Sequence, residues 1–431
     1  MPLSLLNTLA LICKEVGIVD YVKLAIWADK QFERINKKYY YNRYHAGMRM
    51  IADQRREVTQ LLKDLYHPSV ISSANLWLYN YTDGPGYKQR ELPLVSINNL
   101  PVLTRGLQNV DFDYKGKLEN NPKPSEKELA DNVSLWKAAE LDFRDGLCYS
   151  MAAQHDTGKF DLRGSRFLTY RATIATVLDE LALAVKDHGI KKLHKKQWNL
   201  LPLRTKYLGS CQALLDLNHR ICLGGANVLF AVRIPKDKLA LVIQRRSRYV
   251  SDEPGTLTVV PKFFHESIID PKKEADMESS IYREIYEELF GGEDRPGKRR
   301  YLFSDYYHKL CPAVKDLYDN RNNPDHNILT PICLAWDLLR GNYHFAYCFY
   351  VKEQKWWEEY NKQIQVNWEV DEEVKPVVMA DDHKQIYDLI AREDWAPEAY
   401  ISFIEGLRWL QSTNEKSLQY LQLPELSFTA L

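Results

Sequence analysis

Three glutamates in one short run carry the clearest chemical signal of this sequence. Glu284, Glu287 and Glu288 stand at positions i, i+3 and i+4 of the run Arg283 to Glu288, and such positions are neighbours on a helix surface. Like charges this close repel one another. Mg²⁺ or Mn²⁺, hard cations that prefer oxygen ligands, would compensate them. The alternative is a solvated acidic face with Arg283 paired to Glu287 at i+4.

The elements around this run alternate between strands and helices. Apolar runs predict strands at 226–234, 239–246, 255–261, 328–336 and 343–351, with helices at 277–290 and 398–412. Gly291-Gly292 predicts the end of the acidic helix. Gly224-Gly225 precedes a strand rather than a helix, so we interpret it as a turn and not as a phosphate-binding loop.

This order of parts resembles the Nudix hydrolase superfamily. The core of that family's box, Arg-Glu-apolar-x-Glu-Glu, matches Arg283, Glu284, Ile285, Glu287 and Glu288. Two strands that end in Gln-Arg-Arg and a third that ends in Val-Val-Pro precede it, as in the family. The resemblance covers about residues 205–415. It implies an α/β fold, a Nudix-like α/β/α sandwich around a mixed sheet.

The resemblance also implies a reaction, the metal-dependent hydrolysis of a nucleoside diphosphate linked to another group. Mg²⁺ or Mn²⁺ would be the cofactor, because cations neutralise and orient a pyrophosphate and activate water. Glu287 and Glu288 would be metal ligands, and Glu284 a ligand or base. Arg283 would orient a glutamate by a charge-assisted hydrogen bond. Glu266 would add a ligand from the loop before the helix.

The flanks of the run depart from the family's pattern. Ile269 and Ala275 stand where the box has Gly and Glu, and Phe290 stands where it has its second Gly. Lys262-Phe263 replaces the Gly-Gly that usually follows the third strand. Bulky side chains in place of small ones predict a remodelled or closed mouth. The sequence therefore leaves open whether the site is active.

Several further polar residues have two interpretations each. Arg245 and Arg246 lie beyond a strand, where they would hold a phosphate or pair with surface acids. Glu274 and Glu278 lie near the position of the box's first Glu but out of register with it. Four later acids are candidate bases or an exposed acidic loop; they are Glu369, Asp371, Glu372 and Glu373. His265 stands alone, and we assign it no catalytic role.

Composition limits the class of protein. The chain has 431 residues, with 58 Lys plus Arg and 58 Asp plus Glu. This zero net charge argues against a dedicated nucleic-acid binder, which carries a basic excess. Hydrophobic residues make up 45% and there are 27 tyrosines, as in a folded globular protein. The seven cysteines form no C-x-x-C pair, which favours a reducing, cytoplasmic setting.

The N-terminal half contains no motif that we can interpret. Periodicity predicts a helical segment at 1–66, which is too often interrupted by charges to span a membrane. Residues 67–203 predict a largely helical α+β region with strands near 76–79 and 94–97, a helix at 167–187 and an exposed basic connection at 191–196. We therefore divide the chain into 1–66, 67–203, a Nudix-like domain at 204–415 and a tail at 416–431.

Three functions follow from these observations. The first is a Nudix-type phosphohydrolase that acts on a nucleotide-derived small molecule. The second is a catalytically weakened Nudix-like domain that binds a nucleotide-like ligand as a sensor or regulator. The third is an interaction protein that uses the basic, Tyr-rich stretch at 30–49, where cations and aromatic rings alternate. That stretch is also compatible with a helical surface whose long side chains lie over apolar neighbours.

Overall fold

The computed structural model describes residues 36–66, 76–84, 87–97, 110–118, 124–139, 146–155, 158–247, 253–268, 270–292, 311–365 and 377–430. The predictions on residues 1–35, Ile269 and the acidic stretch 366–376, which includes Glu369 and its neighbours, lie outside these residues. Among the described helices, none combines the length and the apolar character that a membrane crossing requires.

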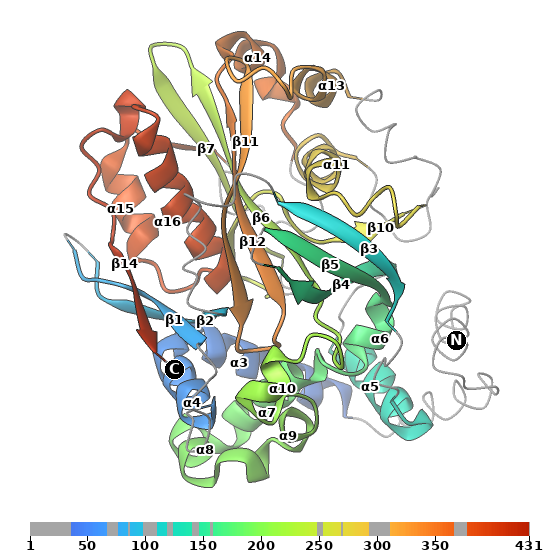
Figure 1. Cartoon of the computed structure of the whole chain (residues 1–431). Helices are drawn as coiled ribbons and strands as arrows, with labels where there is room; N and C mark the ends of the chain where they lie inside the picture. Colours follow the sequence, from blue (N-terminus) through green and yellow to red (C-terminus); the bar gives the residue numbers. More distant parts are fainter. Residues whose placement is uncertain are drawn as a thin grey trace.

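A large mixed sheet forms the centre of the molecule (Figure 1). Its two middle strands, β6 (Gly224–Ile234) and β12 (Tyr343–Val351), are parallel and buried along most of their length. Long apolar strands suit this position because both faces of the sheet are covered. All other neighbouring pairs along the path of the sheet are antiparallel. The strand order is β13 (Val377–Met379), β7 (Lys238–Arg245), β6, β12, β11 (Asn327–Asp337), β2 (Arg90–Ile97), β1 (Leu76–Tyr81) and β14 (Leu426–Ala430).

Alternate residues of the middle strands enter two different cores. Val228, Phe230 and Val232 of β6 pack in one core, whereas Leu229 and Ala231 pack in the other. This follows from the period of two along a strand. The first core lies under α11 (Met277–Leu289), α13 (Pro312–Asp319) and α14 (Gln354–Tyr360). The second lies under α15 (His383–Ala391) and α16 (Pro397–Ser412), on the opposite side in Figure 1.

Two short strands branch from the large sheet beside its centre. They are β8 (Leu257–Val259), which pairs with β7, and β9 (Lys262–Phe264), which pairs with β6. A close approach of β9 to β6 explains one glycine, because a Cβ at Gly225 would lie 1.9 Å from the backbone oxygen of Phe263. Gly224 and Gly225 are thus the first residues of β6, and our interpretation of them as a turn was wrong.

A smaller sheet lies on the α11 side of the large one (Figure 1). Its order is β10 (Glu266–Ser267), β4 (Leu147–Gln154), β5 (Lys159–Arg166) and β3 (Asp111–Lys117). Tyr149 and Phe160 of this sheet share the first core with Phe345 of β12. The smaller sheet therefore packs against the large sheet through side chains from both halves of the chain.

The remaining described helices gather at one end of the molecule, with α3 packed against α7 and α4 against α8 (Figure 1). They are α3 (Lys37–Asp53), α4 (Arg55–Tyr66), α5 (Glu126–Ala138), α6 (Phe167–Arg171), α7 (Thr176–His188), α8 (Ile190–Lys196), α9 (Pro202–Leu208) and α10 (Cys211–Leu215). The predicted single helix at 167–187 is two helices, joined by turns in which backbone N–H groups bond three residues back, as Thr173 does to Tyr170 at 3.1 Å and Thr176 does to Thr173 at 3.2 Å. The stretch 191–196 is helical, although Lys191 and Lys192 are exposed as expected.

The fold is a mixed α/β fold with a mixed sheet, as predicted. The strands expected at 76–79 and 94–97 belong to the same sheet as β6 and β12. The predicted tail at 416–431 contributes β14, which pairs with β1. The boundary near residue 204 therefore crosses a hydrogen-bonded sheet, and the division into domains stays a prediction.

Candidate functional site

Helix α11 carries the acidic run and begins at a well-formed cap. Asp276 accepts hydrogen bonds from the backbone of Glu278 at 3.2 Å and Ser279 at 3.0 Å, which fixes the first turn. The helix ends at Leu289, and Gly291 follows with φ of +69°. A left-handed residue after a helix favours glycine. The helix stop predicted at Gly291-Gly292 is confirmed.

The acidic face of α11 is turned into the protein. Glu284 is 8% exposed and Glu288 is 3% exposed, and the side chain of Glu287 is 12% exposed. A solvated face would leave these carboxylates in water. The expectation of a solvated face is wrong, although the Arg283–Glu287 pair at i+4 that belonged to it is present at 3.9 Å. The three charges must be compensated by partners inside the fold.

Arg283 supplies part of this compensation. Its Nη2 donates to Oε1 of Glu284 at 2.7 Å, and its Nε lies 3.9 Å from Oε1 of Glu287. Its Nη1 donates to the backbone oxygen of Glu266 at 3.4 Å. Burial lowers the pKa of Arg283, but the carboxylates of Glu284, Glu287 and Glu266 outweigh burial and raise it above its ordinary value. Arg283 is therefore a fixed cation among the glutamates that were predicted to hold a metal.

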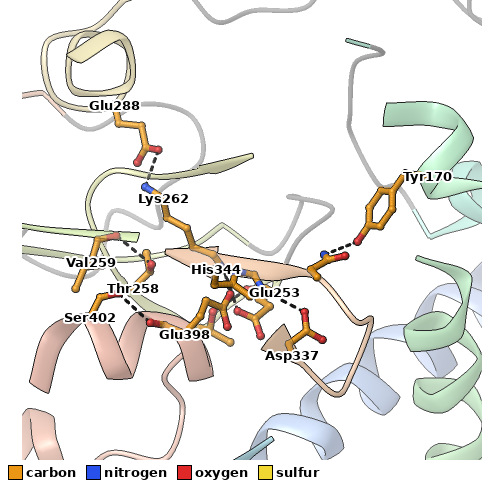
Figure 2. Close-up of polar contacts among 12 residues, drawn as sticks. Tyr170, Glu253, Thr258, Val259, Lys262, Glu288, Asp337, His344, Glu398 and Ser402 are labelled. Carbon is orange, nitrogen blue, oxygen red and sulfur yellow. Dashed lines mark hydrogen bonds and ion pairs between the residues drawn. The ribbon is translucent and has the colours of Figure 1, made fainter. Parts of the chain in front are cut away.

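Glu288 is held by two donors from the large sheet. Nε2 of Gln244, in β7, donates to Oε2 at 3.1 Å, and the backbone N–H of Lys262, in β9, donates to Oε1 at 3.1 Å (Figure 2). Both oxygens of this carboxylate thus accept hydrogen bonds in a buried setting. Gln244 reaches α11 because alternate side chains of β7 face that helix. Neither partner of Glu288 was identified from the sequence, where Lys262 was noted only as a replacement for glycine.

The side chain of Lys262 runs away from α11 into a second polar cluster (Figure 2). Its ammonium lies 2.7 Å from Glu398, in the first turn of α16, and 2.9 Å from Glu253, in the loop before β8. His344 of β12 lies beside them and pairs with Asp337 at 3.1 Å. Lys262 therefore links the acidic helix on one face of the sheet to a buried ion cluster on the other.

The charges of this cluster are coupled. Burial lowers the pKa of His344, but Glu398 and the hydrogen-bonded Asp337 outweigh burial and raise it. A protonated His344 adds a positive charge to a group that contains the carboxylates of Glu253, Glu398 and Asp337 and the ammonium of Lys262. The sequence offered no signal for this cluster, because its five members come from a loop, three strands and a helix.

The two arginines predicted to hold phosphate lie on different sides of β7. Arg245 donates to Asp394 at 2.6 Å and to the carbonyl of Gly255 at 2.5 Å. Burial raises the pKa of Asp394, but hydrogen bonds from Arg392 and Arg245 outweigh burial and lower it to about 2. Arg245 is thus engaged by an acid, which was the alternative to phosphate binding. Arg246 is buried, and strand alternation places it on the side of Gln244 and α11.

The residues around the helix explain the departures from the Nudix pattern. Ala275 is buried in the first core, and Glu274 accepts hydrogen bonds from Ser267 at 2.7 Å and from the N–H of Ile268 at 2.6 Å. Glu274 therefore closes the loop before α11. Phe290 packs edge-on against Trp356 with ring centroids 6.0 Å apart. Phe290 and Trp356 thus fill the space beside the end of α11 with a core contact.

The backbone oxygen of Glu266 accepts a hydrogen bond from Arg283. The carboxylate of Glu266 lies near the start of β4. A Cβ added to Gly146, the residue before β4, would lie 2.9 Å from Oε2 of Glu266. Glu266 pairs with Cys148 of β4, and Phe264, two residues before it, packs on Phe167 and Tyr170. The strand that carries Glu266 is thus covered by the N-terminal half of the chain.

The donor set does not fit a divalent cation as it is arranged. Within the part of the chain that the structure describes, no three His, Cys, Asp or Glu side chains form a group that could hold a metal ion. Mg²⁺ needs near-ideal octahedral geometry and keeps several of its waters. Glu284 and Glu288 instead accept hydrogen bonds from protein donors in a buried position. The metal ligands predicted from the sequence stay a prediction.

No protein-family model matches the chain. A search of curated proteins found no significant match.

Proposed function

We propose that this chain contains a Nudix-like domain that binds a nucleotide-like, phosphate-bearing ligand as a sensor or regulator and does not hydrolyse it. The observation that supports this is the state of Glu288. Its carboxylate accepts hydrogen bonds from Gln244 and from the backbone of Lys262, and it is 3% exposed. A carboxylate held in this way stabilises the fold, and a hydrated cation that bound it would have to displace these donors.

The compensation of charge by the protein supports the same proposal. Arg283 neutralises part of the charge of Glu284 and Glu287. A divalent cation is therefore not required to bring these glutamates together, although their spacing resembles that of a metal-binding helix. On this proposal the acidic helix keeps the architecture of the family, and its carboxylates anchor β7 and β9 to α11.

Metal-dependent hydrolysis of a nucleoside-diphosphate derivative is the second candidate. It is favoured by the placement of Glu284, Glu287 and Glu288 on one helical face, next to Arg283 and to the strand that carries Glu266. Its requirement is a rearrangement that releases Glu288 from Gln244. In that case Mg²⁺ or Mn²⁺ would supply charge neutralisation and an activated water.

One experiment separates the two functions. The full chain is incubated with a panel of nucleoside-diphosphate derivatives and Mg²⁺ or Mn²⁺, and products are followed by chromatography. We expect no metal-dependent turnover above that of Glu287→Gln, the variant at the most accessible of the three glutamates. Glu358→Gln, an exposed site on α14, is the matched control.

The same panel is tested for binding by thermal denaturation. A ligand that binds only the folded state raises the melting temperature, and we expect at least one phosphate-bearing compound to do so without being consumed. Turnover that needs metal, is lost in Glu287→Gln and is kept in Glu358→Gln would overturn the proposal. The absence of any stabilising compound would also count against it.

A further inference from the structure

A cavity of about 460 Å³ lies outside the acidic helix, between three segments that are distant in sequence. These are the start of α4, the connection between β1 and β2, and the connection between α15 and α16. The connection between β1 and β2 is held by paired backbone hydrogen bonds of 3.2 Å between Gly84 and Tyr87. The cavity has the size of a small-molecule site, which is typically about 300–1,000 Å³.

The charges that line this cavity are mostly positive. Among the described residues, Arg55, Arg56, Lys88 and Arg90 contribute four cations, and Glu91 and Glu393 contribute two carboxylates. Glu91 is paired with Lys63 at 3.0 Å. This excess contrasts with the zero net charge of the whole chain, and it indicates an anionic ligand.

Arg55 is the unusual member of this group. Its Nε and Nη1 are buried and have no hydrogen-bond acceptor among the residues that the structure describes. A guanidinium is always protonated in proteins and has no acceptor of its own. Buried donors without acceptors cost about 1–3 kcal/mol each, more when they are charged. A guanidinium with such unmatched donors, in a residue that lines a cavity, indicates an anionic ligand.

The surroundings of Arg55 keep it charged without filling its hydrogen bonds. Burial lowers its pKa, and the fields of Glu253 and Glu398 oppose this. Both of these carboxylates contact Lys262. The neighbouring Arg90 is already engaged, because its Nη2 donates to the carbonyl of Arg392 at 2.6 Å and its guanidinium lies 4.1 Å from the centre of the Tyr400 ring.

We propose that this cavity binds a small molecule through a phosphate or diphosphate group, with Arg55 as its central donor and Arg56 and Lys88 at its rim. The planar fork of Arg55 suits two oxygens of a phosphate. Arg56 and Lys88 are exposed and would add charge at the entrance. The assignment of a phosphate site stands on this geometry. Only the expectation that the rest of the ligand is nucleotide-like rests on the proposed function.

Isothermal titration of the full chain tests this site, with inorganic phosphate, pyrophosphate and adenosine diphosphate as probes. We expect saturable binding of at least one probe at constant ionic strength. Arg55→Gln should weaken this binding by tenfold or more, since a charge-assisted hydrogen bond of about 1.5–3 kcal/mol corresponds to that range. The double variant Arg56→Gln/Lys88→Gln should weaken it severalfold, and it keeps the test valid if Arg55→Gln fails to fold.

Two matched controls make the result specific. Arg49→Gln removes an exposed arginine of α3 outside the cavity lining, and Glu358→Gln alters an exposed site of α14; both should bind the probe as the parent chain does. The inference is overturned if no probe binds beyond the effect of matched salt, or if Arg49→Gln loses as much affinity as the cavity variants. Hydrolysis that depends on Glu287 would refute the proposed function and leave the Arg55 site in place.

Discussion

Lys262 and Glu398 form a buried ion pair between β9 and the first turn of α16, with Nζ and Oε1 2.7 Å apart. Each side chain is 4% exposed. The backbone N–H of the same lysine donates to Glu288 of α11. One residue thus connects the helical layers on both faces of the large sheet, in a position where the Nudix pattern has glycine.

We expect Lys262→Met to destabilise the protein by about 3–5 kcal/mol, because it leaves Glu253 and Glu398 buried without their shared cation. Urea denaturation of the full chain measures this loss. The matched control is Lys416→Met. Lys416 pairs with Asp237 at 2.8 Å, but its side chain is 75% exposed, so its removal should change stability little. Equal losses in the two variants would contradict the assigned role of Lys262.

His265 should make the folded state sensitive to acid. It is fully buried beside Tyr149, and burial followed by the charge of Arg283 lowers its pKa to about 3. The unfolded chain binds this proton at pH near 6.5, so stability falls as pH decreases from about 6.5 towards 3. The contribution of His265 is about 1.4 kcal/mol per pH unit in that range.

We expect His265→Gln to flatten the acid limb of a plot of unfolding free energy against pH. The control His219→Gln should keep the parent slope, because the side chain of His219 is 65% exposed. Denaturant titrations at pH 4 to 7 provide the measurement. A slope in His265→Gln equal to that of the parent chain would rule out this source of acid sensitivity.

Arg204 joins the N-terminal helices to the large sheet. Its Nη1 donates to the hydroxyl of Tyr66 at 3.0 Å and to the carbonyl of Leu338 at 2.8 Å, and it is fully buried. We expect Arg204→Met to cost about 3 kcal/mol, because several buried acceptors lose their donor. Arg321→Met, at an exposed arginine beyond α13, should stay within about 0.5 kcal/mol of the parent. A small effect of Arg204→Met would favour an independent domain that begins near residue 204.

Gly225→Ala should destabilise the junction of β6 and β9. The added Cβ would lie 1.9 Å from the backbone oxygen of Phe263. This oxygen can move away only if β6 and β9 separate. We expect a loss of about 1–3 kcal/mol, as for other overpacked sites, visible as a lower melting temperature. Gly146→Ala is the control, since its Cβ meets the mobile end of Glu266 at 2.9 Å. Equal losses would show that close backbone contact is not the reason for Gly225.

Local patterns predicted the elements around the candidate site well. The acidic helix expected at 277–290 is α11, and the strands expected at 226–234, 328–336 and 343–351 are β6, β11 and β12. These elements follow from periodicity that is visible within a dozen residues. The helix expected at 167–187 is interrupted near Thr173, where backbone N–H groups bond three residues back instead of four.

The sequence by itself determined that Glu284, Glu287 and Glu288 share one face of a helix, because the spacing of residues on a helix depends only on its period. Only the tertiary structure decided what neutralises them. Gln244 and the N–H of Lys262 reach Glu288 from two strands, and the ammonium of Lys262 is held by Glu253 and Glu398 on the far side of the sheet. These contacts depend on how distant segments pack, and no local pattern encodes that packing.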